Sequence, residues 1–199
     1  MGGVALFVSN LNWLDPQITP LVPVLKSYWL MIHVSVVTAS YGFFGICAAC
    51  GIASLAATAF GRNLRELRAI NEMAMIVGLA LLTAGIFFGA VWANESWGRY
   101  WGWDPKETWA LITMFAYALA THSRHIPWLD GPFAFDVLSV VCFATVLMTF
   151  FGVNYFLSGL HSYGHSGGVS LTVPLIGASV VIVLIAAAAG RYFKTSKKR

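Results

Sequence analysis

Charged side chains are scarce in this sequence. Only 10% of its 199 residues are Asp, Glu, Lys or Arg, whereas 58% are hydrophobic. Soluble globular domains carry about 25% charged residues, so this composition excludes an ordinary soluble domain and indicates an integral membrane protein. The formal net charge of +4 resides mainly in short basic segments between and after hydrophobic runs. It therefore needs no nucleic-acid partner to explain it, and we expect none.

Cysteine is also scarce, with three residues in the chain. Cys47 and Cys50 form a C-x-x-C pattern inside a hydrophobic run, where nothing nearby would lower a thiol pKa or expose the thiolate. This position argues against a redox pair. We interpret the two cysteines as small residues that ease helix packing in lipid, and Gly85 and Gly89 in the same way.

Long hydrophobic runs, in contrast, are abundant. Each is long enough, at about 20 residues, to cross a hydrocarbon core of about 30 Å as a helix. We therefore expect an all-α, polytopic transmembrane helical bundle with about five spans. The expected spans cover residues 28–60, 70–92, 105–122, 133–157 and 171–192.

Basic residues predict the orientation of these spans, because loops rich in Lys and Arg stay in the cytoplasm. They lie between the first two runs, after the third and in the C-terminal tail, and these segments alternate correctly to share one side. The basic set comprises Arg62, Arg65, Arg68, Arg124, Lys194, Lys197, Lys198 and Arg199. We expect a multi-pass protein of a bacterial inner (cytoplasmic) membrane, with residues 193–199 as a basic cytoplasmic tail.

The opposite, periplasmic side then holds residues 1–26, a tryptophan-rich loop at 93–107 and a histidine-containing loop at 158–170. Residues 1–26 lack a basic-then-apolar secretory signal, and their GGVALFV stretch is similar to the end of a hydrophobic run. We expect this external segment to end an upstream span, or to work with an upstream partner. Residues 27–192 would form the transmembrane core.

The stretch SWGRYWGWDPKETWALI, at residues 96–112, is the most unusual part of the chain. Asp104, Pro105 and Glu107 predict a helix N-terminus, with a capping carboxylate, a proline at the first helical position and an acidic residue that reaches back. Trp29, Trp92 and Trp109 fit a belt of aromatic side chains at the membrane surface.

A belt explains less well why four aromatic residues cluster in a loop beside two glycines. Glycine permits unusual backbone conformations and close approach, so we interpret the cluster as a platform for a flat apolar ligand. Arg99 and Lys106 could hold carboxylates of that ligand. The platform comprises Trp97, Tyr100, Trp101 and Trp103, beside Gly98 and Gly102.

The pattern W-G-x-x-W-x-W-D resembles the signature of the haem-handling (WWD-domain) family of cytochrome c maturation proteins. It is carried here by Trp97, Gly98, Trp101, Trp103 and Asp104. The stretches LKSYWLMIHV, ATHSR and GVNYFLSGLHSYG resemble one branch in particular, the system II synthases, as a CcsA subunit or the CcsA part of a fused CcsBA protein. The resemblance covers most of residues 20–165.

This resemblance implies that the chain binds haem b. By position, His33 and His161 both lie at the depth of the tryptophan-rich loop, and haem iron takes axial imidazoles from opposite faces. The resemblance implies that they are the external pair of iron ligands, with the aromatic residues of the tryptophan-rich loop, Asp104 and Lys106 around the porphyrin. His122 would help to bind a second haem near the cytoplasmic side.

The second ligand at the inner site would come from a CcsB-like partner or an upstream fused region. His125 shares a helix face with His122 only if the helix persists. His161 and His165 are also compatible with a separate metal site, although two imidazoles form an incomplete shell.

The expected function is export of haem and its presentation to apocytochrome c, whose C-x-x-C-H segment would gain thioether bonds. The chain would then act as part of a cytochrome c synthase, and we assign no catalytic acid or base. One alternative is a haem-delivery protein resembling CcmC or CcmF, without ligase activity. Another is a non-catalytic membrane scaffold, anchored in lipid by its aromatic residues.

Overall fold

A computed structural model describes residues 27–157 and 172–196, and these residues form helices and turns with no strand among them. The predicted all-α class is confirmed. The elements are α2 (Tyr28–Ala59), α3 (Arg65–Trp97), α4 (Pro105–Thr121), η2 (Ser123–His125), α5 (Pro132–Val141), α6 (Phe143–Leu147), η3 (Met148–Gly152), α7 (Val153–Phe156) and α8 (Thr172–Ser196).

Four helical segments of the described chain are long and apolar enough to cross a membrane. They are Tyr28–Ala59, Arg65–Trp97, Pro132–Phe156 and Leu175–Lys194. The 17-residue α4 runs beside them. The polytopic helical bundle is therefore confirmed. The second helix is longer than predicted, because polar residues at both ends continue the helix beyond its apolar centre at 70–92.

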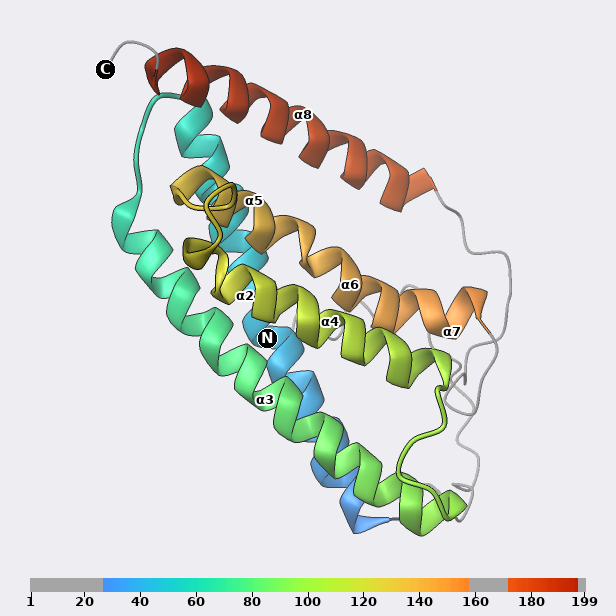
Figure 1. The fold of residues 1–199 in the computed structure, drawn as a ribbon. Helices are drawn as coiled ribbons and strands as arrows, with labels where there is room; N and C mark the ends of the chain where they lie inside the picture. The colour runs from blue at the N-terminus through green and yellow to red at the C-terminus, as the bar shows by residue number, and fades with distance from the viewer. Residues whose placement is uncertain (1–26, 158–171, 197–199) are drawn as a thin grey trace, which may run out of the picture.

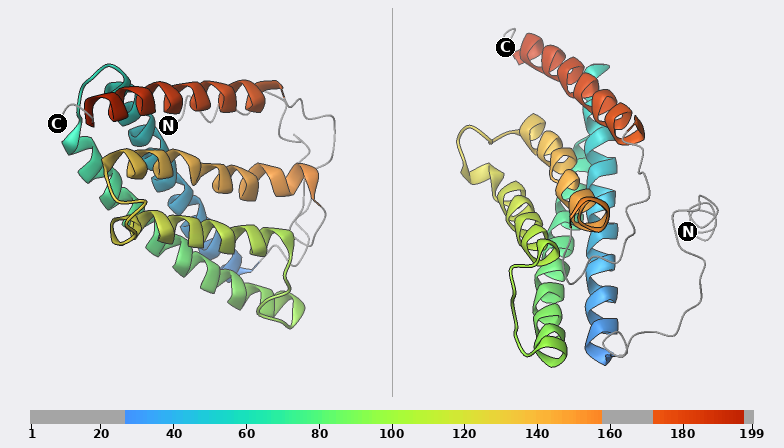
Figure 2. Two further views of the ribbon diagram at one scale, coloured as in Figure 1. Left: turned by 45° about the horizontal axis from the view of Figure 1, so that its top comes forward. Right: turned by 90° about the vertical axis from the view of Figure 1, so that its right-hand side faces the viewer.

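Helices α2 and α3 form an antiparallel pair, and α4, the α5–α7 segment and α8 run roughly side by side across it (Figures 1 and 2). In the core, the Phe44 ring stacks on Tyr117 with centroids 3.6 Å apart. Gly78 allows this close approach, since a Cβ atom there would lie 2.8 Å from the Phe44 ring. Leu82 and Met75 are fully buried in the same cluster.

One end of the bundle, here called the basic end, brings together the end of α2, the start of α3, the end of α4 and the end of α8 (Figure 1). Arg124 forms an ion pair with Glu72, and Gly61 lies against the Arg191 guanidinium. The basic segments of the described residues thus gather at one end, while residues 197–199 of the predicted tail lie outside the described part of the chain.

Two polar contacts join α3 to α5 near the basic end. The Arg68 guanidinium donates to both carboxylate oxygens of Asp136, whose side chain is fully buried, at 2.8 to 3.1 Å. One helical turn further along, Asn71 Nδ2 donates to Ser139 Oγ at 2.9 Å. These contacts fix the register between the two helices, because an ion pair separated in the bundle interior would be strongly unfavourable.

The opposite end, here called the aromatic end, holds the start of α2, the end of α3 and the start of α4. Ser27 Oγ donates to Glu95 and links α2 to α3 there. Gly98 caps α3 in the left-handed conformation, with φ at 70°, as glycine commonly does at helix C-termini. The aromatic loop, defined from here on as residues 98–104, connects α3 to α4.

Candidate functional site

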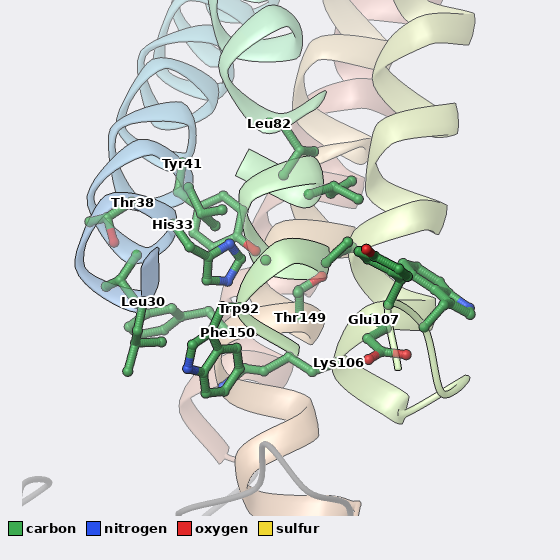
Figure 3. Close-up of a pocket in the computed structure, with 18 residues that line it drawn as sticks. Leu30, His33, Thr38, Tyr41, Leu82, Trp92, Lys106, Glu107, Thr149 and Phe150 are labelled. Atoms are coloured by element: carbon green, nitrogen blue, oxygen red, sulfur yellow. The ribbon is translucent and has the colours of Figure 1, made fainter. Parts of the chain in front are cut away.

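A cavity of about 290 Å³ lies between α2, α3, α4 and the η3 segment, toward the aromatic end. Figure 3 shows His33 projecting into it from α2, with Thr149 and Glu107 across from it. Its walls are mainly apolar and aromatic. A few polar groups interrupt them, a composition typical of small-molecule sites, which occupy roughly 300–1,000 Å³.

His33 is the one histidine of the described residues that lines this cavity. Its Nδ1 lies 2.7 Å from the carbonyl oxygen of Gly85. A carbonyl can only accept, so Nδ1 carries a proton, and in the neutral ring the lone pair is then on Nε2. Neutral imidazole binds metals through such a lone pair, and a hydrogen bond at the other ring nitrogen orients it.

The wall behind His33 is built to receive its ring. Trp92 is buried and stacks on the imidazole at 9°, with centroids 6.5 Å apart. Gly89 lies against the ring, because a Cβ at that position would come within 2.7 Å of Cε1. Gly85 and Gly89 do allow close helix packing, as predicted. The small-residue interpretation missed that the Gly85 carbonyl also binds His33 Nδ1 and that Gly89 leaves room for the His33 ring.

The aromatic residues named from the sequence divide into two groups. Tyr100 and Trp101 line the cavity. Trp97 packs edge-on against Trp92, with centroids 4.8 Å apart, and does not line the cavity. Trp103 is 70% exposed and does not line the cavity. Its ring packs edge-on with that of Trp101, with centroids 5.7 Å apart. The four members of the expected platform therefore do not form one surface: two line the cavity and two do not.

The start of α4 carries the predicted capping box. Asp104 Oδ2 accepts from the Lys106 backbone N–H at 3.2 Å, and Glu107 Oε2 accepts from the Asp104 N–H at 3.2 Å. The same Glu107 oxygen also accepts from the Gly102 N–H at 2.8 Å. One carboxylate thus holds the backbone on both sides of Trp103.

Between these two bonds, Trp103 has a φ of 56°. This left-handed conformation is unfavourable for a bulky residue and persists where the surroundings enforce it. Gly102 leaves space for the Arg99 side chain, since a Cβ at position 102 would lie 2.8 Å from the Arg99 guanidinium. Arg99 is exposed and does not line the cavity, whereas Lys106 does.

The remaining predicted ligands lie elsewhere. His122 is exposed at the C-terminus of α4, at the basic end, and its Nδ1 lies 2.8 Å from the Ala118 carbonyl oxygen. The His125 ring is 6.3 Å from it, centroid to centroid. His161 and His165 lie outside the described residues. The part of the chain that the structure describes therefore brings one of the two expected external ligands into the cavity.

Several residues of the cavity wall were not identified from the sequence, among them Glu107 in a ligand-facing role, Tyr41 and Thr149. Thr149 is buried and its hydroxyl lies 3.1 Å from that of Thr113. The signal for Glu107 was present in the capping pattern. No local pattern marks Tyr41 or Thr149, because their direction depends on how α2 and η3 are rotated in the bundle.

This donor set suits haem: an imidazole with its lone pair on Nε2, flat aromatic walls and a cation from Lys106. Imidazole is a common axial ligand of haem iron, and an ammonium group attracts carboxylates such as the haem propionates. A cavity of about 290 Å³ is at the small end of the range for ligand sites. A whole porphyrin is larger than this cavity and would extend beyond it.

Residues 1–161 match the family described as Cytochrome C assembly protein. The chain is 51% identical over 171 residues to Protein NrfI of Wolinella succinogenes, which covers 82% of this chain and 19% of that protein. It is 40% identical over 156 residues to the cytochrome c biogenesis protein CcsA of Chlamydomonas reinhardtii, covering 74% of this chain and 44% of the relative.

A third relative, the cytochrome c biogenesis protein CcsA of Gloeobacter violaceus, is 35% identical over 210 residues, or 75% of this chain and 62% of the relative. The chain thus spans between 19% and 62% of the length of these three proteins. The matched region contains α2 to α7, the cavity and the aromatic loop. With that extent of similarity, the chain belongs to the cytochrome c assembly protein family, as a CcsA-like member.

Proposed function

We propose that this chain, within a larger protein or complex, carries haem across a bacterial inner membrane and presents it for covalent attachment to apocytochrome c. The observation that carries the proposal is the His33 imidazole. It stands in the wall of an aromatic cavity, with Nδ1 bound to Gly85 and its lone pair on Nε2. Membership of a cytochrome c assembly family supports haem b as the bound group.

In this proposal His33 and His161 hold the haem iron on the periplasmic side. Two axial imidazoles would fill the coordination shell of the iron and so keep water and oxygen from reaching it. Trp101 and Tyr100 cover one part of the porphyrin, and Lys106 holds a propionate. His122, at the other end of the bundle, would bind haem on its way outward together with a ligand from a CcsB-like partner or an upstream fused region.

The chemistry served is thioether formation. The S–H of each cysteine in a C-x-x-C-H segment adds across a haem vinyl C=C, with sulfur bonding to one carbon and hydrogen to the other. No oxidant or reductant enters this addition. The contribution of the chain is to hold the vinyl groups where the thiols arrive, since such positioning is worth on the order of several kcal/mol.

The test is haem titration of the purified full-length chain in detergent. We expect wild type to give a low-spin, bis-imidazole absorption spectrum, and His33→Ala or His161→Ala to lose it. His125→Ala is a matched control, because that ring is exposed at the basic end. Free imidazole should restore part of the low-spin spectrum in both site variants. If both retained the wild-type spectrum, the chain would be better described as a scaffold.

A further inference from the structure

A lysine and an asparagine from separate spans meet beside the cavity. Lys106 lies in the first turn of α4 and lines the cavity. Its Nζ donates to Asn154 Oδ1 at 3.0 Å. Asn154 lies in α7 and is not one of the cavity-lining residues. The contact therefore ties a cation of the cavity wall to the end of the fourth hydrophobic run.

The Asn154 amide is fixed at both ends. Its Nδ2 donates to the Phe150 carbonyl oxygen at 2.8 Å, while its Oδ1 accepts from Lys106. Only the NH₂ group can donate to a carbonyl, and only the amide oxygen can accept from an ammonium group. The two contacts thus agree on one orientation, which presents oxygen to Lys106.

The direction of Asn154 depends on the π-helical η3 segment, Met148–Gly152, which ends two residues before it. A π-helical turn contains about one residue more than an α-helical turn, and each residue of an α-helix turns by about 100°. Residues after η3 are therefore rotated relative to an uninterrupted α-helix. This rotation brings Asn154 toward α4, where it reaches Lys106.

The Asn154 amide is a neutral acceptor, so it adds no negative charge beside the ammonium group. The Asp104 carboxylate already acts electrostatically on the Lys106 ammonium. An Asp at 154 would add a second carboxylate beside it, whereas the amide adds no charge. The two carboxylates nearest in sequence accept from backbone N–H groups: Asp104 from Lys106 N, and Glu107 from Gly102 N and Asp104 N. Both are thus engaged in capping α4 and holding the aromatic loop.

We propose that Asn154 is a positioning residue that holds the Lys106 ammonium in the cavity wall, so that the site selects a ligand carrying carboxylates. The inference rests on the proposed function, and it names the haem carboxylates as the groups that the Lys106 ammonium binds. A lysine side chain has considerable rotamer entropy to lose on ordering. Fixing it in advance favours binding, as preorganisation does generally.

The experiment compares haem with haem dimethyl ester, which keeps the iron and the ring but lacks free carboxylates. Dissociation constants for both are measured with full-length wild type, Asn154→Ala, Lys106→Met and the double variant. We expect Asn154→Ala to weaken haem binding by about 2- to 10-fold, and to leave ester binding unchanged. Asn154→Gln should restore part of the preference. In the Lys106→Met background, Asn154→Ala should have no further effect, because it acts through the lysine.

Asn63→Ala is a matched control, since Asn63 Oδ1 also accepts from a cation, Arg68, but at the basic end. It should leave the ratio of the two dissociation constants unchanged. Equal weakening of haem and ester by Asn154→Ala would reduce Asn154 to a structural residue and overturn the inference alone. The same holds if its effect persists fully without Lys106. Wild type that binds neither compound would overturn both the inference and the proposed function.

Discussion

Adding one methyl group at Gly89 should displace the proposed iron ligand. A Cβ at this position would lie 2.7 Å from His33 Cε1 and 2.8 Å from its Nδ1, whereas ordinary contacts begin near 3.4 Å. The imidazole would therefore have to move by roughly 0.7 Å away from α3. That movement lengthens the 2.7 Å contact between Nδ1 and the Gly85 oxygen beyond a good hydrogen bond.

The size of the effect follows from these two changes. Losing the hydrogen bond costs about 0.5–1.5 kcal/mol, and forcing the side chain off its rotamer costs about as much again. The sum, about 1–3 kcal/mol, corresponds to a haem dissociation constant raised by about 5- to 150-fold in Gly89→Ala. The measurement is a haem titration followed by the Soret absorbance.

Gly42→Ala is the matched control, because a Cβ there would meet nothing within 4 Å. It makes the same substitution in a helix of the same bundle, and we expect its dissociation constant to equal that of wild type. Free imidazole should restore a low-spin spectrum to Gly89→Ala if displacement of His33 is the cause. Equal haem affinity in the two alanine variants would refute the assignment of His33 to the iron.

Three further predictions concern the bundle, the aromatic loop and the basic end. Arg68→Met should destabilise the protein by about 3–5 kcal/mol, because it leaves the buried Asp136 carboxylate unpaired; Arg68→Met combined with Asp136→Leu should recover most of this in thermal unfolding in detergent. Glu107→Ala should cost about 0.5–2 kcal/mol of local stability and speed proteolysis of the aromatic loop, whereas Glu107→Gln should behave more like wild type. His122→Ala should reduce haem loading of the outer site only when the upstream partner region is present, with recovery on adding imidazole; full loading without imidazole would count against a role in transit.

The start of α4 shows what the sequence can predict well. Asp104, Pro105 and Glu107 act through contacts within a few residues, so the pattern alone gives the first residue of the helix and its capping bonds. The helix spans follow from hydrophobic length in the same way. The bounds of α2 were predicted to within one residue, since apolar composition determines which segments can lie in lipid.

The backbone conformation of the aromatic loop was predicted less well. The glycines, Gly98 and Gly102, were the expected positions of unusual backbone conformation. Gly98 adopts it, but the second left-handed residue is Trp103 and not Gly102. The reason is Glu107, whose carboxylate accepts from the N–H groups on both sides of Trp103. The contact with the Asp104 N–H belongs to the predicted capping box, but the second contact, with the Gly102 N–H, depends on the folded loop and no residue spacing predicts it.

The fourth span was predicted as a plain helix, and its π-helical segment was missed. The run from Leu147 to Val153 contains no proline, and Gly152 is its only glycine, so its composition gives little local reason for a break in the hydrogen-bond register. Yet this segment turns Thr149 into the cavity and Asn154 toward Lys106. Side chains at such a site depend on rotation about the helix axis, which hydrophobic length does not determine.

The first turn of α4 connects these separately placed parts. Lys106 and Glu107 are consecutive and both line the cavity, but their side chains form hydrogen bonds with different parts of the chain. Glu107 reaches back to the aromatic loop, and Lys106 reaches across to Asn154 at the end of the fourth span. A shift of α7 relative to α4 would therefore move the cation, and a shift of the loop would move the carboxylate. Because the two residues share one helical turn, a displacement of this turn would disturb both contacts at once.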